Sequence, residues 1–131
     1  MNFKKQNIGS ERGQTMTEFA MVLPLLVVLL FGIIQFGIAF NNYVALTDAV
    51  RAASRKGAVS RGAGNPVGDC TGAAQNAAGD LDKAKLKVSC TSSWQSGSDV
   101  TVTGTYPYSI HLLGWVMKSG DLKTQIKERV E

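Results

Sequence analysis

The sequence predicts an α+β protein with a long N-terminal membrane-spanning helix and a small outer domain. That domain is expected to contain a short helix and a roughly three-stranded antiparallel sheet. Three observations support this. Residues 19–40 are apolar and carry no charged side chain. Period-two alternation of apolar and polar residues begins only after Leu86. A chain of 131 residues also leaves room for just one small domain beside a membrane span.

The first segment, residues 1–13, is polar and basic and has no hydrophobic periodicity, so we predict a leader there rather than part of a fold. An ordinary signal peptide has an apolar region of about 7 to 15 residues and a small-residue cleavage site after it. The apolar run that follows here is longer, at 22 residues. Cleavage near Ala39, which would remove the whole anchor, is the alternative.

The apolar run is long enough to cross a bilayer, since about 1.5 Å of rise per residue gives about 33 Å. Pro24 lies inside it and is expected to bend or locally open the helix. Gly32, Gln35 and Gly37 suggest close helix–helix packing with an amide hydrogen bond across the interface. Ordinary tolerance of glycine in membrane helices is the alternative.

A helical pattern continues beyond Asn41, because apolar residues recur there at steps of three and four, as at Leu46, Val50 and Ala53. We therefore predict one helix over residues 15–56, with Gly57 as its C-terminal stop. The predicted organisation is a leader (1–13), a transmembrane and assembly helix (14–40), an extramembrane continuation of that helix (41–57) and a periplasmic α+β domain (58–131).

In the outer domain we predict a short helix over residues 70–81, then strands over 86–91 and 99–106 joined by a turn at 96–98. Pro107 is expected to end the second strand.

Beyond it, residues 111–116 are predicted to cover the core and residues 118–120 to turn the chain. Residues 122–130 are expected to return as a third strand. Trp115 is interpreted as a cover residue of the core, with an exposed contact for another component as the alternative.

The two cysteines, Cys70 and Cys90, lie in a region rich in Gly, Ser and Thr, which favours a disulfide in an oxidising compartment. Two free thiols are the alternative. Without a CxxC pair or clustered histidines the two cysteines make a poor metal site, so we expect no metal and no cofactor.

The bulk charge and the titratable residues exclude several function classes. The net charge is +4, but the basic residues are mixed with acidic ones along the chain and do not form the basic cluster that nucleic-acid binding requires. The sole histidine, His111, precedes apolar leucines and is not expected to act as a base. We therefore predict neither an enzyme nor a binder of a small-molecule substrate.

Orientation cannot be read from charge, because similar numbers of basic residues flank the two sides of the span. The basic stub and the cysteine pair together favour an outer domain outside the cytoplasm.

Glu18 lies directly before the apolar run, where an ionisable residue is unusual. A carboxylate exposed to lipid there costs on the order of 2 to 3 kcal/mol. Glu18 therefore needs water or a partner for its charge, and the prepilin resemblance set out below implies that the amino terminus of a neighbouring subunit in an assembly can supply it. Snorkelling of Glu18 into the headgroup region is the alternative.

From Gly13 onward the chain resembles a type IV prepilin signal. It resembles more narrowly the TadE-like family of the tight-adherence (Tad) pilus systems, whose members are minor pseudopilins. The narrower resemblance is carried by the motif Thr17-Glu18-Phe19-Ala20-Met21-Val22-Leu23-Pro24.

The resemblance implies that a membrane-embedded prepilin peptidase cuts the Gly13–Gln14 bond, which makes Glu18 the fifth residue of the mature chain. Other pilins or pseudopilins and the Tad secretion machinery are the further partners that it implies. It also implies a single-pass protein of the inner membrane that later enters the extracellular pilus. One departure is Gln14, which can cyclise and lose its amine charge. The alternative function is an uncleaved single-span periplasmic adaptor of an envelope or secretion complex.

Overall fold

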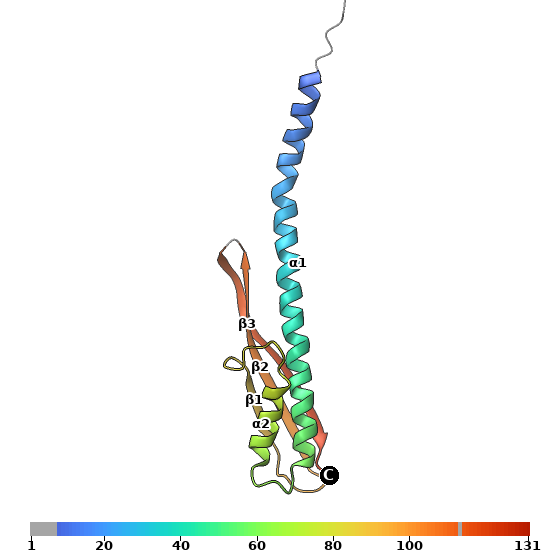
Figure 1. Ribbon diagram of the computed structural model, residues 1–131, viewed down its shortest axis with the longest axis vertical. Coiled ribbons are helices and arrows are strands. Elements are labelled where there is room, and N and C mark those ends of the chain that lie inside the picture. The colour runs from blue at the N-terminus through green and yellow to red at the C-terminus, as the bar shows by residue number, and fades with distance from the viewer. Residues whose placement is uncertain (1–7, 113) are drawn as a thin grey trace, which may run out of the picture.

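The fold joins one very long helix to a small sheet domain, as the sequence predicts for the α+β class. The computed structural model of the protein describes residues 8–112 and 114–131 (Figure 1). The elements in chain order are α1 (Ile8–Val59), α2 (Pro66–Asn76), β1 (Lys87–Thr91), β2 (Asp99–Leu112) and β3 (Trp115–Arg129).

Helix α1 runs for 52 residues without interruption, and it extends beyond the predicted range of 15–56 at both ends. The helix continues through Pro24. It curves gently along its length and shows no break (Figure 1). Gly57 does not stop α1, which ends two residues later. Gly57 is instead buried where a Cβ atom would lie 3.0 Å from Cγ1 of Val100, so its lack of a side chain permits close packing of β2 on the helix.

The core lies between the C-terminal half of α1 and the sheet. Leu46, Ala49, Val50 and Ala53 are fully buried, at the helical spacing that the sequence predicts. They face a sheet whose central strand places Gly104 so near that a Cβ atom there would overlap the side chains of Val50 and Leu46. The helix and the sheet therefore meet at a point where only glycine fits.

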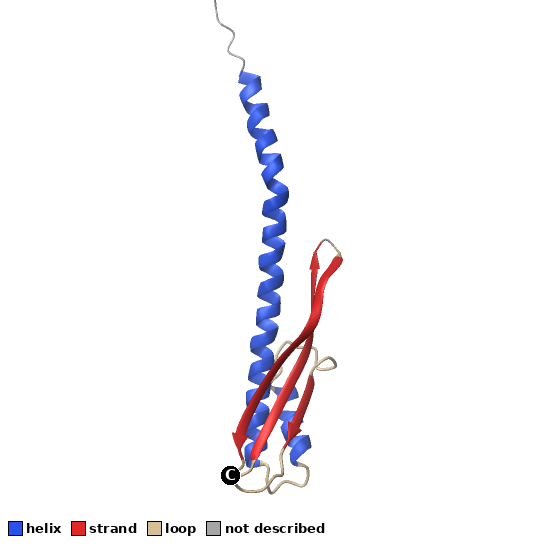
Figure 2. Ribbon diagram, turned by 180° about the vertical axis from the view of Figure 1, so that it is seen from behind, coloured by secondary structure: helices blue, strands red, loops and turns tan. Residues whose placement is uncertain are grey.

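The sheet is antiparallel in the order β1-β2-β3, and one of its faces is covered by helix while the other is open (Figure 2). Alternation along β2 separates the two faces: Val100 and Val102 are buried, whereas Thr101 and Thr103 are not. The predicted three-stranded antiparallel sheet is thus confirmed, with the two-sided character usual for such sheets.

The sequence-based bounds of β2 and β3 are wrong in two respects. Strand β2 continues through Pro107 to Leu112, and residues 118–120 lie in β3 rather than in a turn. The reason is that β1 pairs with β2 only as far as Thr105, so Pro107 lies where β2 has one neighbour instead of two. Proline is tolerated on such a free edge because no ladder hydrogen bond is lost there.

Helix α2 lies four residues nearer the N-terminus than predicted. Its start is fixed by Asn65, whose side-chain oxygen accepts a hydrogen bond from the Gly68 amide at 2.9 Å, and by Pro66 in the first turn. The alanines that suggested a longer helix continue into a turn that contains Gly79, which has a φ of 57°. Ala78 and Leu81 still contribute to the core.

Candidate functional site: the N-terminal half of α1

The N-terminal half of α1 is apolar on every side and has almost no partner within the chain. Every residue over 13–40 is exposed except Gln35 and Ala39, which are half-buried. Phe36, for example, is 72% exposed. By length and composition this is the one helix among the described residues that could cross a membrane. A surface of this kind requires an apolar partner from outside the chain.

The predicted processing bond, Gly13–Gln14, lies inside α1. Gly13 is exposed, and no atom lies within 4 Å of where its Cβ would be. Its carbonyl oxygen accepts a hydrogen bond from the Thr17 hydroxyl at 2.9 Å. A protease therefore finds an unobstructed backbone at this bond, but one held in helical form.

Glu18 has a partner that the sequence analysis missed. The side-chain amide of Gln14 donates a hydrogen bond to Oε1 of Glu18 at 3.2 Å. These are the residues predicted to be first and fifth in the mature chain. The signal that could have revealed the contact is their spacing of four, which places two side chains on one helical face.

The predicted packing residues Gly32, Gln35 and Gly37 are found in two different settings. Gly32 and Gly37 are exposed, with open space where a Cβ would be. Gln35 instead lines a cavity of about 200 Å³ between α1 and β2. At about 100° per residue Gly32 and Gly37 also lie about 140° apart around the helix, so they offer two surfaces rather than one stripe. Their role in helix packing stays a prediction.

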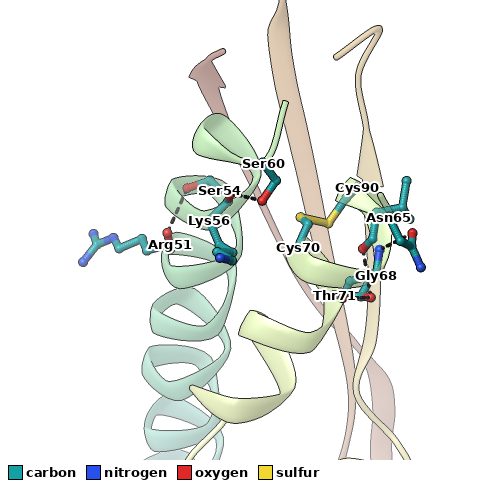
Figure 3. The surroundings of a disulfide bond; sticks show 10 residues. Arg51, Ser54, Lys56, Ser60, Asn65, Gly68, Cys70, Thr71 and Cys90 are labelled. Atoms are coloured by element: carbon teal, nitrogen blue, oxygen red, sulfur yellow. Dashed lines mark hydrogen bonds between the residues drawn. A yellow bond between two sulfur atoms is a disulfide. The ribbon is translucent and has the colours of Figure 1, made fainter. Parts of the chain in front are cut away.

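The disulfide between Cys70 and Cys90 is formed, and it ties α2 to β1 (Figure 3). The two Cα atoms are 6.5 Å apart, and both cysteines belong to the core. The bond closes a loop of the kind that stabilises small domains in oxidising compartments.

The titratable residues of the outer domain lie mainly on its surface. His111 is exposed on β2, where its Nε2 atom lies 2.7 Å from the Ser109 hydroxyl. The two residues are neighbours on one face of a strand, so a local hydrogen bond accounts for the contact. Within residues 8–112 and 114–131, no three His, Cys, Asp or Glu side chains are grouped so that they could hold a metal ion.

Comparison with known proteins agrees with the resemblance seen in the sequence. Residues 13–55 match the family model described as TadE-like protein. The matched segment begins at the predicted processing site and covers both halves of α1 almost to the end of the helix, whereas the outer domain lies beyond it. No curated protein and no solved structure matches the chain. The match therefore shows a similarity to TadE-like proteins over this segment of α1.

Proposed function

We propose that this TadE-like chain is a minor pseudopilin, a structural and assembly subunit of a Tad pilus, matured by prepilin peptidase cleavage after Gly13. The observation that carries the proposal is the apolar half of α1, which is exposed on all sides and preceded by Gly13 and Glu18 at a prepilin-like spacing. The family match over residues 13–55 supports it, because that match covers both features.

In this proposal the same apolar surface is buried first in the membrane and then in the assembled pilus. Before assembly residues 19–40 lie in the inner membrane, with the outer domain outside the cytoplasm. After assembly the same side chains pack against the helices of neighbouring subunits. Both environments remove apolar surface from water, which is favourable by roughly 25 cal/mol for each Å² buried. The Cys70–Cys90 disulfide supports the orientation, since such bonds persist in oxidising compartments.

Cleavage requires α1 to open locally, because the Gly13–Gln14 bond is helical and the Gly13 carbonyl also accepts the Thr17 hydroxyl. Two features lower the free energy of opening. A glycine is less favourable in a helix than alanine by about 1 kcal/mol. The helix also begins only five residues earlier, at Ile8, and helix ends fray readily. The peptidase thus meets a site that is unobstructed and easily unwound.

Glu18 acts in this proposal as the contact that sets the axial position of one subunit against the next. Cleavage creates an amino group at Gln14, and the Glu18 carboxylate of a neighbour can pair with it inside the apolar filament. Before assembly the Gln14 side chain already donates to Glu18, which reduces the penalty of holding a carboxylate near lipid. Cyclisation of Gln14 would remove the amine charge and leave Glu18 with hydrogen bonds alone.

The test is to replace Gly13 by leucine in the full chain and to measure the intact mass of the membrane-extracted protein together with pilus formation. Gly13→Leu is expected to retain residues 1–13 and to abolish its contribution to pili. Gly32→Leu is the matched control for processing, because Gly32 lies in the same helix with equally open surroundings and should be cut normally.

A wild-type chain that keeps residues 1–13 in cells with an active peptidase would contradict the proposal. Unaltered pili in the Gly13→Leu strain would do the same. Both results would favour the uncleaved single-span adaptor.

A further inference from the structure

The hairpin of β2 and β3 extends well beyond the core of the outer domain. Strand β1 pairs with β2 only from Thr101 to Thr105, so from Tyr106 onward β2 and β3 continue as a two-stranded ribbon. Figures 1 and 2 both show this ribbon rising alongside α1 toward its N-terminal half, with the tip standing clear of the helix.

The tip of the ribbon carries a cluster of exposed apolar side chains. Trp115, Val116 and Met117 are consecutive and are 79%, 59% and 65% exposed. Gly114 before them has a φ of 87°, which closes the hairpin. The sequence-based prediction that Trp115 covers the core is therefore wrong: the side chain lies at the end of the ribbon, away from the buried residues. An aromatic residue in such a setting is typical of a membrane–water interface.

The ribbon carries this cluster to the level of the apolar half of α1. Tyr108 and Ser109 line the same cavity as Gln35 and Ala39, so this part of β2 already lies beside the end of the apolar run. Leu112 follows three residues later, which at about 3.3 Å per residue adds about 10 Å. The tip is therefore level with residues inside the 19–40 segment, and a bilayer that holds this segment also reaches the tip.

The exposed side chains of the ribbon change in character away from its tip. Trp115, Val116 and Met117 come first, with exposed His111 paired in register with Val116, and Lys118, exposed and paired with Ile110, comes directly after them. Next comes the cavity of about 200 Å³ between the ribbon and α1, where Asn42, Lys85 and Tyr108 are among the lining residues. The tip is thus the most apolar part of the ribbon, and Lys118 is long enough to extend its ammonium group from there toward the lipid phosphates.

We propose that Trp115, Val116 and Met117 insert into the near leaflet of the bilayer that α1 spans, with the long side chain of Lys118 reaching back toward the lipid phosphates. The partner is thus a lipid surface, and the contact is a second point of attachment that fixes the rotation and tilt of the outer domain. The length of ribbon from Ser109 to Leu112, about 10 Å, agrees with the depth of about 5 to 10 Å usual for interfacial segments. The inference requires α1 to cross a bilayer, and it is independent of cleavage and of pilus assembly.

The test uses tryptophan fluorescence of the full chain reconstituted in phosphatidylethanolamine–phosphatidylglycerol vesicles that contain brominated lipid. Trp94→Phe leaves Trp115 as the only tryptophan, because the chain has two. Brominated lipid is expected to reduce Trp115 emission by about twofold or more, as for an interfacial tryptophan. Val116→Asp with Met117→Asp should remove this quenching.

The matched control moves the fluorophore to the far end of the same strand. The variant Trp94→Phe, Trp115→Phe, Lys127→Trp places it at an exposed β3 position paired with Thr101, and no lipid quenching is expected there. Should Trp94→Phe disturb the fold, the difference between wild type and Trp115→Phe gives the same readout.

Two results would overturn the proposal. One is Trp115 emission that brominated lipid leaves unchanged and acrylamide quenches as strongly as in the control. The other is protection of Trp115 that appears only at a high ratio of protein to lipid, which would assign the tip to a second copy of this chain.

Discussion

The two halves of α1 belong to one continuous helix but find their partners in different places. In the C-terminal half, Leu46 and Val50 are fully buried against the sheet while the opposite side of the helix is exposed. In the N-terminal half, residues 19–40 are apolar all round and almost wholly exposed. A one-sided pattern is completed within the chain, whereas an all-round pattern requires a bilayer or other helices.

The glycines associated with the two halves of α1 differ in the same way. Gly57 and Gly104 lie where the sheet approaches the C-terminal half of α1, and a side chain at either would meet Val100, Val50 or Leu46. Gly32 and Gly37, in the N-terminal half, face open space. The first pair is required by contacts inside the chain. Any constraint on the second pair has to come from another molecule.

The largest effect is expected at Glu18, the charged residue directly before the apolar run of residues 19–40. Glu18→Ala should be cleaved normally yet reduce surface pili by about tenfold or more, since removing one partner of a buried ion pair costs on the order of 3 to 5 kcal/mol. Pili are counted by electron microscopy and processing by intact mass. Glu18→Gln is the control that keeps hydrogen bonding without the charge.

If Glu18→Gln assembles as wild type does, a hydrogen bond such as that from Gln14 is sufficient and the charge is not needed. Normal pili in Glu18→Ala would remove the assembly role of Glu18 altogether.

A leucine exchanged in each half sharpens the comparison. Leu46→Ala should lower the free energy of unfolding of the outer domain by about 4 kcal/mol, as deletion of a fully buried side chain leaves a cavity. Leu26→Ala should leave it within about 0.5 kcal/mol, because Leu26 is exposed and does not belong to the buried core. Urea titration of the full chain in detergent micelles measures both, followed by Trp94 fluorescence in a Trp115→Phe background, since Trp94 packs against the core. A loss of similar size in Leu26→Ala would mean that the two halves are not independent.

The features predictable from the sequence are those written in local patterns. The apolar run, the helical spacing around Leu46 and Val50, and the alternation in β2 each depend on residues close in the chain, and the structure confirms them. The disulfide was also predictable, because Cys70 and Cys90 are the only two cysteines.

The features that were missed depend on where another element ends. Pro107 was expected to end its strand, but β1 stops short of it and leaves a free edge that tolerates proline. For the same reason Trp115 reaches the end of a ribbon rather than the core. In the candidate site, the Gln14–Glu18 contact was within reach of helical spacing, whereas the place of Gln35 beside β2 depends on how far the ribbon extends.

The disulfide is expected to stabilise the outer domain without affecting the membrane insertion of the apolar half. Replacing both Cys70 and Cys90 by serine should lower the free energy of unfolding by about 3 kcal/mol, the value for a loop of this length. Membrane insertion of α1 should be unchanged. Urea titration gives the first quantity and carbonate extraction of membranes the second. Wild type treated with reductant serves as the control that keeps both side chains, and an unaltered unfolding midpoint in both samples would contradict the prediction.

The smallest effect is expected from a single methyl group placed in each half. Gly104→Ala should destabilise the outer domain by about 2 kcal/mol, because the new Cβ overlaps Val50, whose branched side chain has little rotameric freedom. Gly37→Ala adds the same methyl group where no atom lies within 4 Å, so the unfolding free energy of the outer domain should not change.

Combining Gly104→Ala with Val50→Ala should recover part of the loss, and the coupling measured in this double-mutant cycle isolates the overlap from the other effects of each substitution. If Gly37→Ala leaves the monomer intact but impairs pili, the open space at Gly37 is filled by a neighbouring helix in the filament. If it changes neither, Gly37 reflects only the tolerance of membrane helices for glycine, and the packing surface of the apolar half must be sought among its large side chains.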